Sequence, residues 1–290
     1  HGMKERLLKN KKGATTNKKS ADWSKLPNLR TAMHQGHCGS CWAFAAIQTL
    51  QAWVYIRFKK SFQFSVQEIV DCAPSFGCQG GFQAAAFNYI RKNGVTSSTQ
   101  YPYVNAKQNC KFGAAARLLP TYNKSLSINK LPNTSTSKYN KRYLKYLFGK
   151  PATNGFSLPS LRVLQKAHPL FNARGKFQGV KGHSMVPGNM DGYFEILERG
   201  PIAAGFYVDS QFQGYKGGVY YGSPECSRQS FSNHAVVAVG FSKVTKPPHV
   251  KFLNSWGPGW GAQGFFLVSI ESGQGVCAML NNGINSVPVV

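Results

Sequence analysis

The chain has 290 residues, of which 42% are hydrophobic and 13% aromatic, so it can bury a core in one large domain or two packed lobes. No apolar run approaches the ~20 residues of a membrane-spanning helix, which predicts a soluble protein. The 35 Lys and Arg against 10 Asp and Glu give a net charge of +25. Such a surface attracts polyanions such as nucleic acid, sulfated glycans or anionic membranes.

The first part of the chain is predicted to be a flexible basic arm, residues 1–20, followed by a mainly helical lobe, residues 21–113. Residues 41–58 are apolar on nearly every face, as in a buried central helix. Ser65 precedes a short helix, with Glu68 placed three residues later as in a capping box. A glycine turn at Gly80 and Gly81 leads into a further helix.

Residues 114–189 form a predicted insertion or linker that is rich in Lys, Asn, Ser and Thr and has weak periodicity. Short helices are expected near residues 141–148 and 158–166. Two N-x-S/T sequons make Asn123 and Asn133 candidate glycosylation sites.

Residues 190–290 are predicted to form a β lobe. The apolar runs 202–208, 234–241, 250–253 and 264–269 are short, rich in Val and Phe, and separated by Gly, Pro and Ser. They indicate an antiparallel sheet or barrel. A helical lobe followed by a β lobe makes the fold class α+β.

Seven cysteines leave at least one thiol unpaired if the others form bridges. Together with the sequons, they favour an oxidising route through the secretory pathway, ending in a lysosome, a vacuole or the extracellular space.

Cys38 and Cys41 stand three residues apart, which leaves several kinds of site open. No second ligand pair follows as a zinc site requires, and no βαβ pattern precedes as a thioredoxin-type redox pair requires. The remaining interpretations are a structural disulfide, or a nucleophile beside a structural cysteine.

The stretch Cys38-Gly39-Ser40-Cys41-Trp42 matches the signature C-G-[SA]-C-[WY] of papain-like cysteine proteases at every position. The chain also resembles this family elsewhere, over roughly residues 20–113 and 190–280. The further matching segments, in chain order, are Asp22-Trp23, Ser65 to Cys72, Gly77 to Gly81, Tyr101-Pro102-Tyr103, Gly200-Pro201-Ile202, Asn233 to Val236 and Asn254 to Gly257.

The resemblance implies a two-lobe fold with the active cleft between the lobes, and a catalytic set of Cys41, His234, Asn254 and Gln35. A thiol nucleophile acts as a thiolate, which the N-terminus of a helix and a neighbouring imidazolium both stabilise. Asn254 is expected to orient the imidazole, and Trp256 to shield their hydrogen bond from water. Gln35 and the Cys41 backbone N–H are expected to bind the oxyanion.

The resemblance also implies three disulfides, Cys38–Cys78, Cys72–Cys110 and Cys226–Cys277, which leave Cys41 free. The substrate pocket is expected to accept a bulky residue at the second position before the cut, including a polar or basic one. Gly205 suggests room there, and Gln83 and Asn282 are more polar than is usual in the family. No metal or organic cofactor is expected. The residues expected to bind substrate are Trp256, Gly80, Gly81, Phe82, Gln83, Gly205, Asn233, Ala235 and Asn282.

The sequence departs from the family in the spacing of its motifs. His234 and Asn254 follow Cys41 by 193 and 213 residues, against roughly 130–150 in the family. The basic insertion accounts for the excess. The sequence shows no paired-histidine loop near Cys78 and no amino-capping domain, which favours an endopeptidase over an exopeptidase. Protein or peptide substrates are expected. The protein is also expected to be a monomer and to bind cystatin-like inhibitors. The alternatives are an inactive papain-like scaffold and a polyanion-binding protein that acts through the insertion.

Overall fold

The computed structural model describes residues 18–112, 170–172, 175–273, 275–281 and 283–290. The chain divides into two compact units, residues 1–111 with 176–290, and residues 112–175. The architecture below is that of the first unit. The sequons at Asn123 and Asn133, the helices expected near 141–148 and 158–166, and Asn282 lie outside the described residues.

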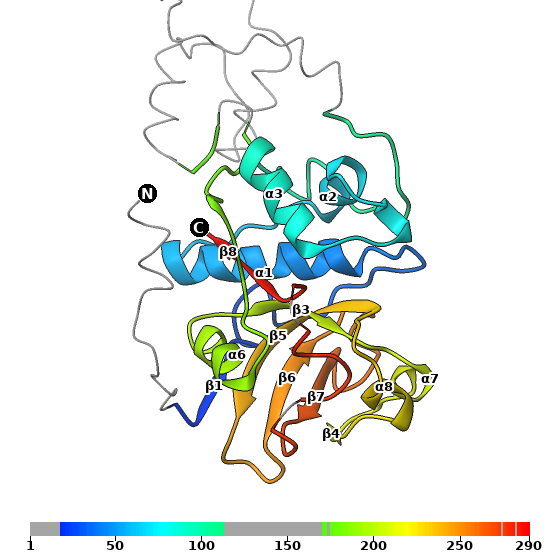
Figure 1. Ribbon diagram of the computed structural model, residues 1–290. Coiled ribbons are helices and arrows are strands. Elements are labelled where there is room, and N and C mark those ends of the chain that lie inside the picture. Colours follow the sequence, from blue (N-terminus) through cyan, green and yellow to red (C-terminus); the bar gives the residue numbers. More distant parts are fainter. Residues whose placement is uncertain (1–17, 113–169, 173–174, 274, 282) are drawn as a thin grey trace, which may run out of the picture. The chain divides into compact units, whose positions relative to one another are not determined.

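The first unit contains a long helix with smaller helices on one side and a sheet on the other (Figure 1). Helix α1, Cys41–Phe58, has the bounds that its apolar sequence predicts, and most of its side chains are buried. It contacts α3, Gln83–Asn93, and strand β5, His234–Ser242. Such burial on nearly all faces is what a continuous apolar helix requires.

The described residues form one eight-stranded sheet with the pairing order β2-β8-β3-β5-β6-β7-β4, and β1 pairs with β5. The pairs are antiparallel except for β4 with β7. The path ends at β2 and β4, so the sheet is open. The remaining strands are β1 Ser20–Asp22, β2 Gly182–Met185, β3 Ile202–Phe206, β4 Val219–Tyr220, β6 His249–Leu253, β7 Phe265–Ser269 and β8 Ser286–Val289.

The predicted α+β fold is confirmed, and the four apolar runs expected to be strands correspond to β3, β5, β6 and β7. Further short elements complete the unit. They are α2 Val66–Cys72, the 3-10 turn Gly77–Gln79, α6 Met190–Leu197, α7 Ser210–Gln213 and α8 Pro224–Ser227.

Only half of the predicted capping box forms at the start of α2. The Ser65 side chain accepts the Glu68 backbone N–H as expected. The Glu68 carboxylate does not return to Ser65, whose own N–H bonds to Thr96 O. Instead it is fully buried and accepts hydrogen bonds from Tyr89, the Thr96 N–H and Lys176. Glu68 therefore joins α2 to distant segments rather than capping its own helix.

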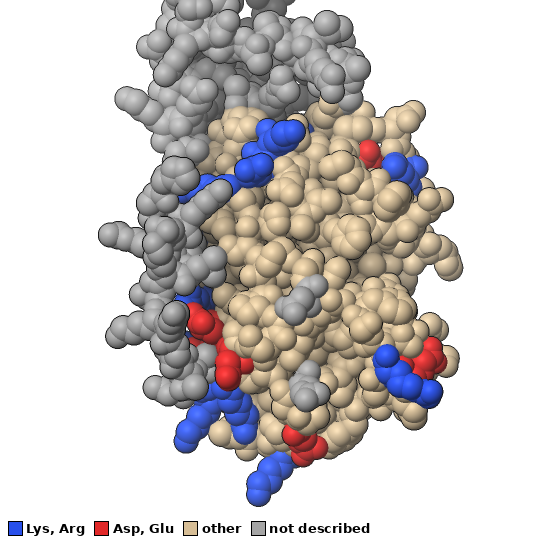
Figure 2. Space-filling model, in the orientation of Figure 1, with Lys and Arg blue, Asp and Glu red and all other residues tan. Residues whose placement is uncertain are grey.

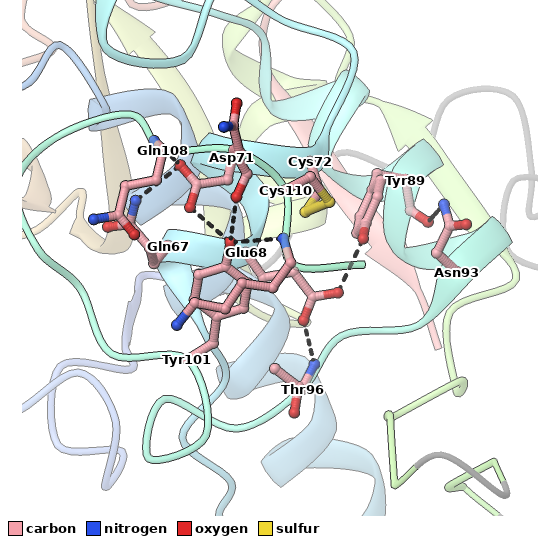
Figure 3. The surroundings of a disulfide bond; sticks show 12 residues. Gln67, Glu68, Asp71, Cys72, Tyr89, Asn93, Thr96, Tyr101, Gln108 and Cys110 are labelled. Atoms are coloured by element: carbon pink, nitrogen blue, oxygen red, sulfur yellow. Dashed lines mark hydrogen bonds between the residues drawn. A yellow bond between two sulfur atoms is a disulfide. The ribbon is translucent and has the colours of Figure 1, made fainter. Parts of the chain in front are cut away.

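A second buried carboxylate lies beside the Cys72–Cys110 disulfide (Figure 3). Asp71 Oδ1 accepts from the Gln67 side chain and from the Gln108 N–H, at 2.9 and 2.6 Å. Its Oδ2 accepts from the Tyr101 hydroxyl at 2.7 Å. These bonds and the disulfide fix the segment 101–110 to α2.

Candidate active site

Cys41 is the free cysteine of the chain, and it lies at the first position of α1. The other six cysteines are paired as Cys38–Cys78, Cys72–Cys110 and Cys226–Cys277, the pairs that the resemblance implies. No acidic residue occurs in the first turn of α1. The helix N-terminus therefore offers an uncompensated positive potential to a Cys41 thiolate.

His234, the first residue of β5, forms a side-chain hydrogen bond with Cys41. Burial raises the pKa of the Cys41 thiol, but the charge and hydrogen bond of His234 and backbone hydrogen bonds at Ala235 and Trp42 lower it more. The pKa of Cys41 consequently lies below that of an ordinary thiol. Burial lowers the pKa of His234, whereas Cys41 and Asn254 raise it above its ordinary value. Each group thus favours the charged form of the other.

Asn254, directly after β6, holds the far side of the imidazole. His234 Nε2 donates to Asn254 Oδ1 at 2.8 Å, and the same oxygen accepts the Ser255 N–H at 2.8 Å. The Trp256 ring lies 4.9 Å from the imidazole, centroid to centroid. Since Nε2 is bonded to Asn254, Nδ1 is the ring nitrogen available to Cys41.

Gln35 is buried and is held at four of its polar atoms. Its backbone N–H bonds to Ser255 O at 2.8 Å, and its backbone carbonyl accepts the Tyr103 hydroxyl at 2.7 Å. Its side-chain Oε1 accepts from Ser255 Oγ at 2.7 Å, and its Nε2 donates to Cys38 O at 2.9 Å. An amide nitrogen carries two hydrogens. The second one is the candidate oxyanion donor.

A pocket of about 220 Å³ opens beside Cys41 and His234. Its volume fits one side chain rather than a whole small-molecule ligand. Six of the residues expected to bind substrate line it: Gly80, Gly81, Phe82, Gln83, Asn233 and Ala235. Two further lining residues, Ser232 and Ile284, were not predicted from the sequence.

The space expected above Gly205 is occupied by those two residues. A Cβ atom on Gly205 would lie 2.5 Å from Ser232 Oγ and 2.7 Å from Ile284 Cγ2. Gly205 therefore permits close packing beneath the pocket wall and does not itself line the pocket. Trp256 does not line the pocket either. Its ring lies against the His234 imidazole instead.

Two polar lining residues are committed to the protein's own backbone. Asn233 exchanges two hydrogen bonds with the backbone of Val208, at 2.7 and 2.8 Å. Gln83 is almost fully buried, and its Nε2 donates to Ala204 O at 3.2 Å. Phe82 and Asn233 are the exposed residues of the lining, and Phe82 is 56% exposed. Ile284 and Phe82 thus give the pocket an apolar character.

Within the described part of the chain, no group of three or more His, Cys, Asp or Glu could hold a metal ion. No helix among the described residues is both long and apolar enough to cross a membrane. On the face drawn in Figure 2, charged side chains lie toward the edges and uncharged residues fill the middle.

Comparison with known proteins gives one consistent family. The family described as "Papain family cysteine protease" matches residues 17–148 and 166–287. The chain is 30% identical to pro-cathepsin H of Bos taurus over 277 residues, which cover 93% of the chain and 65% of that relative. It is 29% identical to papaya proteinase 4 of Carica papaya, over 90% of the chain and 58% of that relative. The chain thus spans about 58–65% of the length of these curated relatives.

Solved structures agree on the fold. A bromelain protease from Ananas comosus, in complex with the inhibitor E64, is 26% identical and has a TM-score of 0.65 over 94% of this chain and 99% of its own. A cysteine protease of Carica candamarcensis, in complex with E-64, is 22% identical with the same TM-score, over 94% and 98% of the two chains, and supports the fold alone.

Proposed function

Since the chain belongs to the papain family of cysteine proteases, we propose that it is an endopeptidase that cleaves peptide bonds through Cys41. The observation that carries this proposal is the relay from Cys41 to His234 to Asn254, which starts at a helix N-terminus. The shifts of both pKa values favour a thiolate–imidazolium pair, which is the reactive form of a cysteine nucleophile.

The reaction proceeds in two steps. The Cys41 thiolate attacks the peptide carbonyl carbon, and the carbonyl electron pair moves to oxygen. The Gln35 amide and the Cys41 backbone N–H stabilise this oxyanion. As the C–N bond breaks, His234 Nδ1–H gives its proton to the leaving amine, and a thioester remains. A water molecule then gives its proton to His234 and attacks the thioester, which releases the acid and restores the pair.

The pocket beside Cys41 is proposed to bind the substrate residue two positions before the cleaved bond. Ile284 and the exposed ring of Phe82 favour an apolar side chain there, since the polar groups of Asn233 and Gln83 are already bonded to backbone. The proposed preference is therefore for an apolar side chain that fits a volume of about 220 Å³, in place of the polar or basic one expected from Gln83 and Asn282.

The cellular location, glycosylation, oligomeric state, inhibitors and polyanion binding of the protein are also proposed. Three disulfides fit an oxidising secretory route, for which a lysosome, a vacuole or the extracellular space is the proposed destination. Glycosylation at Asn123 and Asn133, a monomeric state and cystatin-like inhibitors are proposed on the sequence alone. The net charge of +25 supports polyanion binding as a second function.

The test uses the full chain under reducing, mildly acidic conditions. Wild-type protein is expected to cleave a quenched fluorescent peptide, and E-64 is expected to add to Cys41, as located by peptide mass spectrometry. Cys41→Ser and His234→Ala should remove both activities. His249→Ala is the matched control, because His249 lies at the opposite end of β6 from Asn254. Intact wild-type protein that neither cleaves peptides nor takes up E-64 would leave the inactive scaffold as the better assignment.

A further inference from the structure

Tyr103 connects the two segments that carry the reactive groups. Its hydroxyl lies 2.7 Å from Gln35 O and 2.7 Å from Ser40 Oγ. Gln35 is the candidate oxyanion donor, and Ser40 is the residue directly before Cys41. A single phenol therefore bonds to the Gln35 loop and to the start of α1, from a segment more than 60 residues further along the chain.

The directions of these hydrogen bonds follow from counting hydrogens. Tyr103 has one hydroxyl hydrogen, and the Gln35 carbonyl can only accept, so Tyr103 donates to Gln35. Ser40 must then donate to the Tyr103 oxygen. Since the Ser40 hydroxyl hydrogen is used there, the Cys38 carbonyl accepts from the Ser40 backbone N–H at 2.7 Å and from Gln35 Nε2 at 2.9 Å. The network fixes which hydrogen of Gln35 Nε2 is engaged and which one is left for substrate.

The Ser40 hydroxyl is unusual for its position. Serine at a helix N-cap normally accepts a backbone N–H of the first turn, which stabilises the helix by about 1 kcal/mol. Ser40 makes no such bond. Its hydroxyl lies 2.7 Å from the Tyr103 hydroxyl instead, and its backbone, at φ −98° and ψ 13°, is not in the extended conformation of a usual N-cap. The pattern is more easily understood as positioning than as stabilisation.

The Tyr103 ring is held firmly. It packs edge-on against Phe44 of α1, with centroids 4.9 Å apart and an interplanar angle of 81°. Burial raises the pKa of Tyr103 and the Cys41 charge raises it further, while the hydrogen bond with Ser40 lowers it, for a net increase. The phenol therefore stays protonated as a donor. The segment that carries it is anchored by Tyr101, Asp71 and the Cys72–Cys110 disulfide.

We propose that Tyr103 is a positioning residue that sets the Gln35 amide, and with it the oxyanion site, at the correct distance from Cys41. This inference rests on the proposed peptidase function. It predicts that losing the hydroxyl weakens the transition state rather than substrate binding or formation of the thiolate. One hydrogen bond of ordinary strength corresponds to a roughly 5- to 15-fold loss of kcat.

The experiment compares Tyr103→Phe, Gln35→Ala and the variant with both changes, and uses Tyr215→Phe as the control. Tyr215→Phe also removes one phenol, but that phenol bonds to the backbone of Gly218 in the β lobe and not to Gln35 or Ser40. Tyr103→Phe should lower kcat with KM unchanged, and should leave the pH profile of Cys41 alkylation by iodoacetamide unchanged, since alkylation forms no oxyanion. In the Gln35→Ala background, Tyr103→Phe should have no further effect.

Three results would overturn the positioning role while the peptidase function stands. They are wild-type kcat in Tyr103→Phe, an equal loss in Tyr215→Phe, and full additivity of Tyr103→Phe with Gln35→Ala. Absence of hydrolysis by the intact wild-type chain would overturn the proposed function, and this inference with it.

Discussion

His234 and Asn254 lie at facing ends of two adjacent strands, and the hydrogen bond from His234 Nε2 to Asn254 Oδ1 measures 2.8 Å. The antiparallel register of β5 with β6, in which Val237 faces Leu253, brings the two side chains together. The imidazole is thereby oriented by the sheet itself, and the Ser255 N–H fixes the carboxamide in turn.

Asn254→Ala is expected to lower kcat by roughly 5- to 30-fold, because the imidazole loses the bond that orients it and helps raise its pKa. The same loss should lower the pKa of His234, so the alkaline limb of the kcat/KM profile moves to lower pH. Steady-state kinetics between pH 4 and 10 measure both effects. Asn93→Ala removes a carboxamide from the end of α3 and should change neither; an unshifted profile in Asn254→Ala would argue against the orienting role.

Gly205→Ala is expected to reshape the pocket through Ser232 and Ile284. The new Cβ would lie 2.5 Å from Ser232 Oγ, so both side chains must move, and the space beside Cys41 shrinks. The value of kcat/KM should fall more for substrates with Phe or Leu two residues before the cut than for those with Ala. Gly217→Ala is the control, because its Cβ meets no atom within 4 Å. Equal losses for large and small substrates would contradict this account of Gly205.

The buried ion pair of Lys176 with Glu68 predicts a large stability effect. The two side chains are 4% and 0% exposed, and their atoms lie 2.5 Å apart. Lys176→Met leaves the Glu68 carboxylate buried without its cation, which should lower the free energy of unfolding by about 3–5 kcal/mol. Arg199→Met breaks the exposed pair with Glu195 and should cost less than about 1 kcal/mol. Urea unfolding followed by tryptophan fluorescence measures the free energy of unfolding of both variants. Equal losses for Lys176→Met and Arg199→Met would contradict the prediction.

Much of the fold was predictable because it is local. Helix α1 is apolar on nearly every face, and strands β3, β5, β6 and β7 are short runs of apolar residues between turns. The strands β1, β2, β4 and β8 were not predicted, since they are short and each is defined by its partner rather than by its own pattern. Glu68 followed the local rule only in part: tertiary contacts with Tyr89 and Lys176 took the carboxylate away from its helix.

The residues of the site that belong to a sequence motif were predictable. The residues whose role depends on tertiary packing were not. Cys41, His234 and Asn254 were identified by segments that resemble a family, and the structure brings them together. Tyr103 was visible in the segment Tyr101-Pro102-Tyr103, but nothing local indicates a hydrogen bond to Gln35, 68 residues away. Gly205 illustrates the opposite case, because a missing side chain predicts space without showing which neighbours fill it.

The central claim is that Cys41 and His234 form a thiolate–imidazolium pair. Because the pKa of Cys41 is lowered and that of His234 is raised, each group favours the charged form of the other, and the pair should form below the pH of about 8.5 at which an ordinary thiol ionises. The most direct measurement is the rate of Cys41 alkylation by iodoacetamide as a function of pH.

In the wild type, the alkylation rate should reach its inflection at a lower pH than that of an ordinary thiol. His234→Ala should move the inflection up to the range of an ordinary thiol or above it, because burial alone raises the pKa of Cys41. A wild-type inflection near pH 8.5 that His234→Ala leaves unchanged would contradict the account.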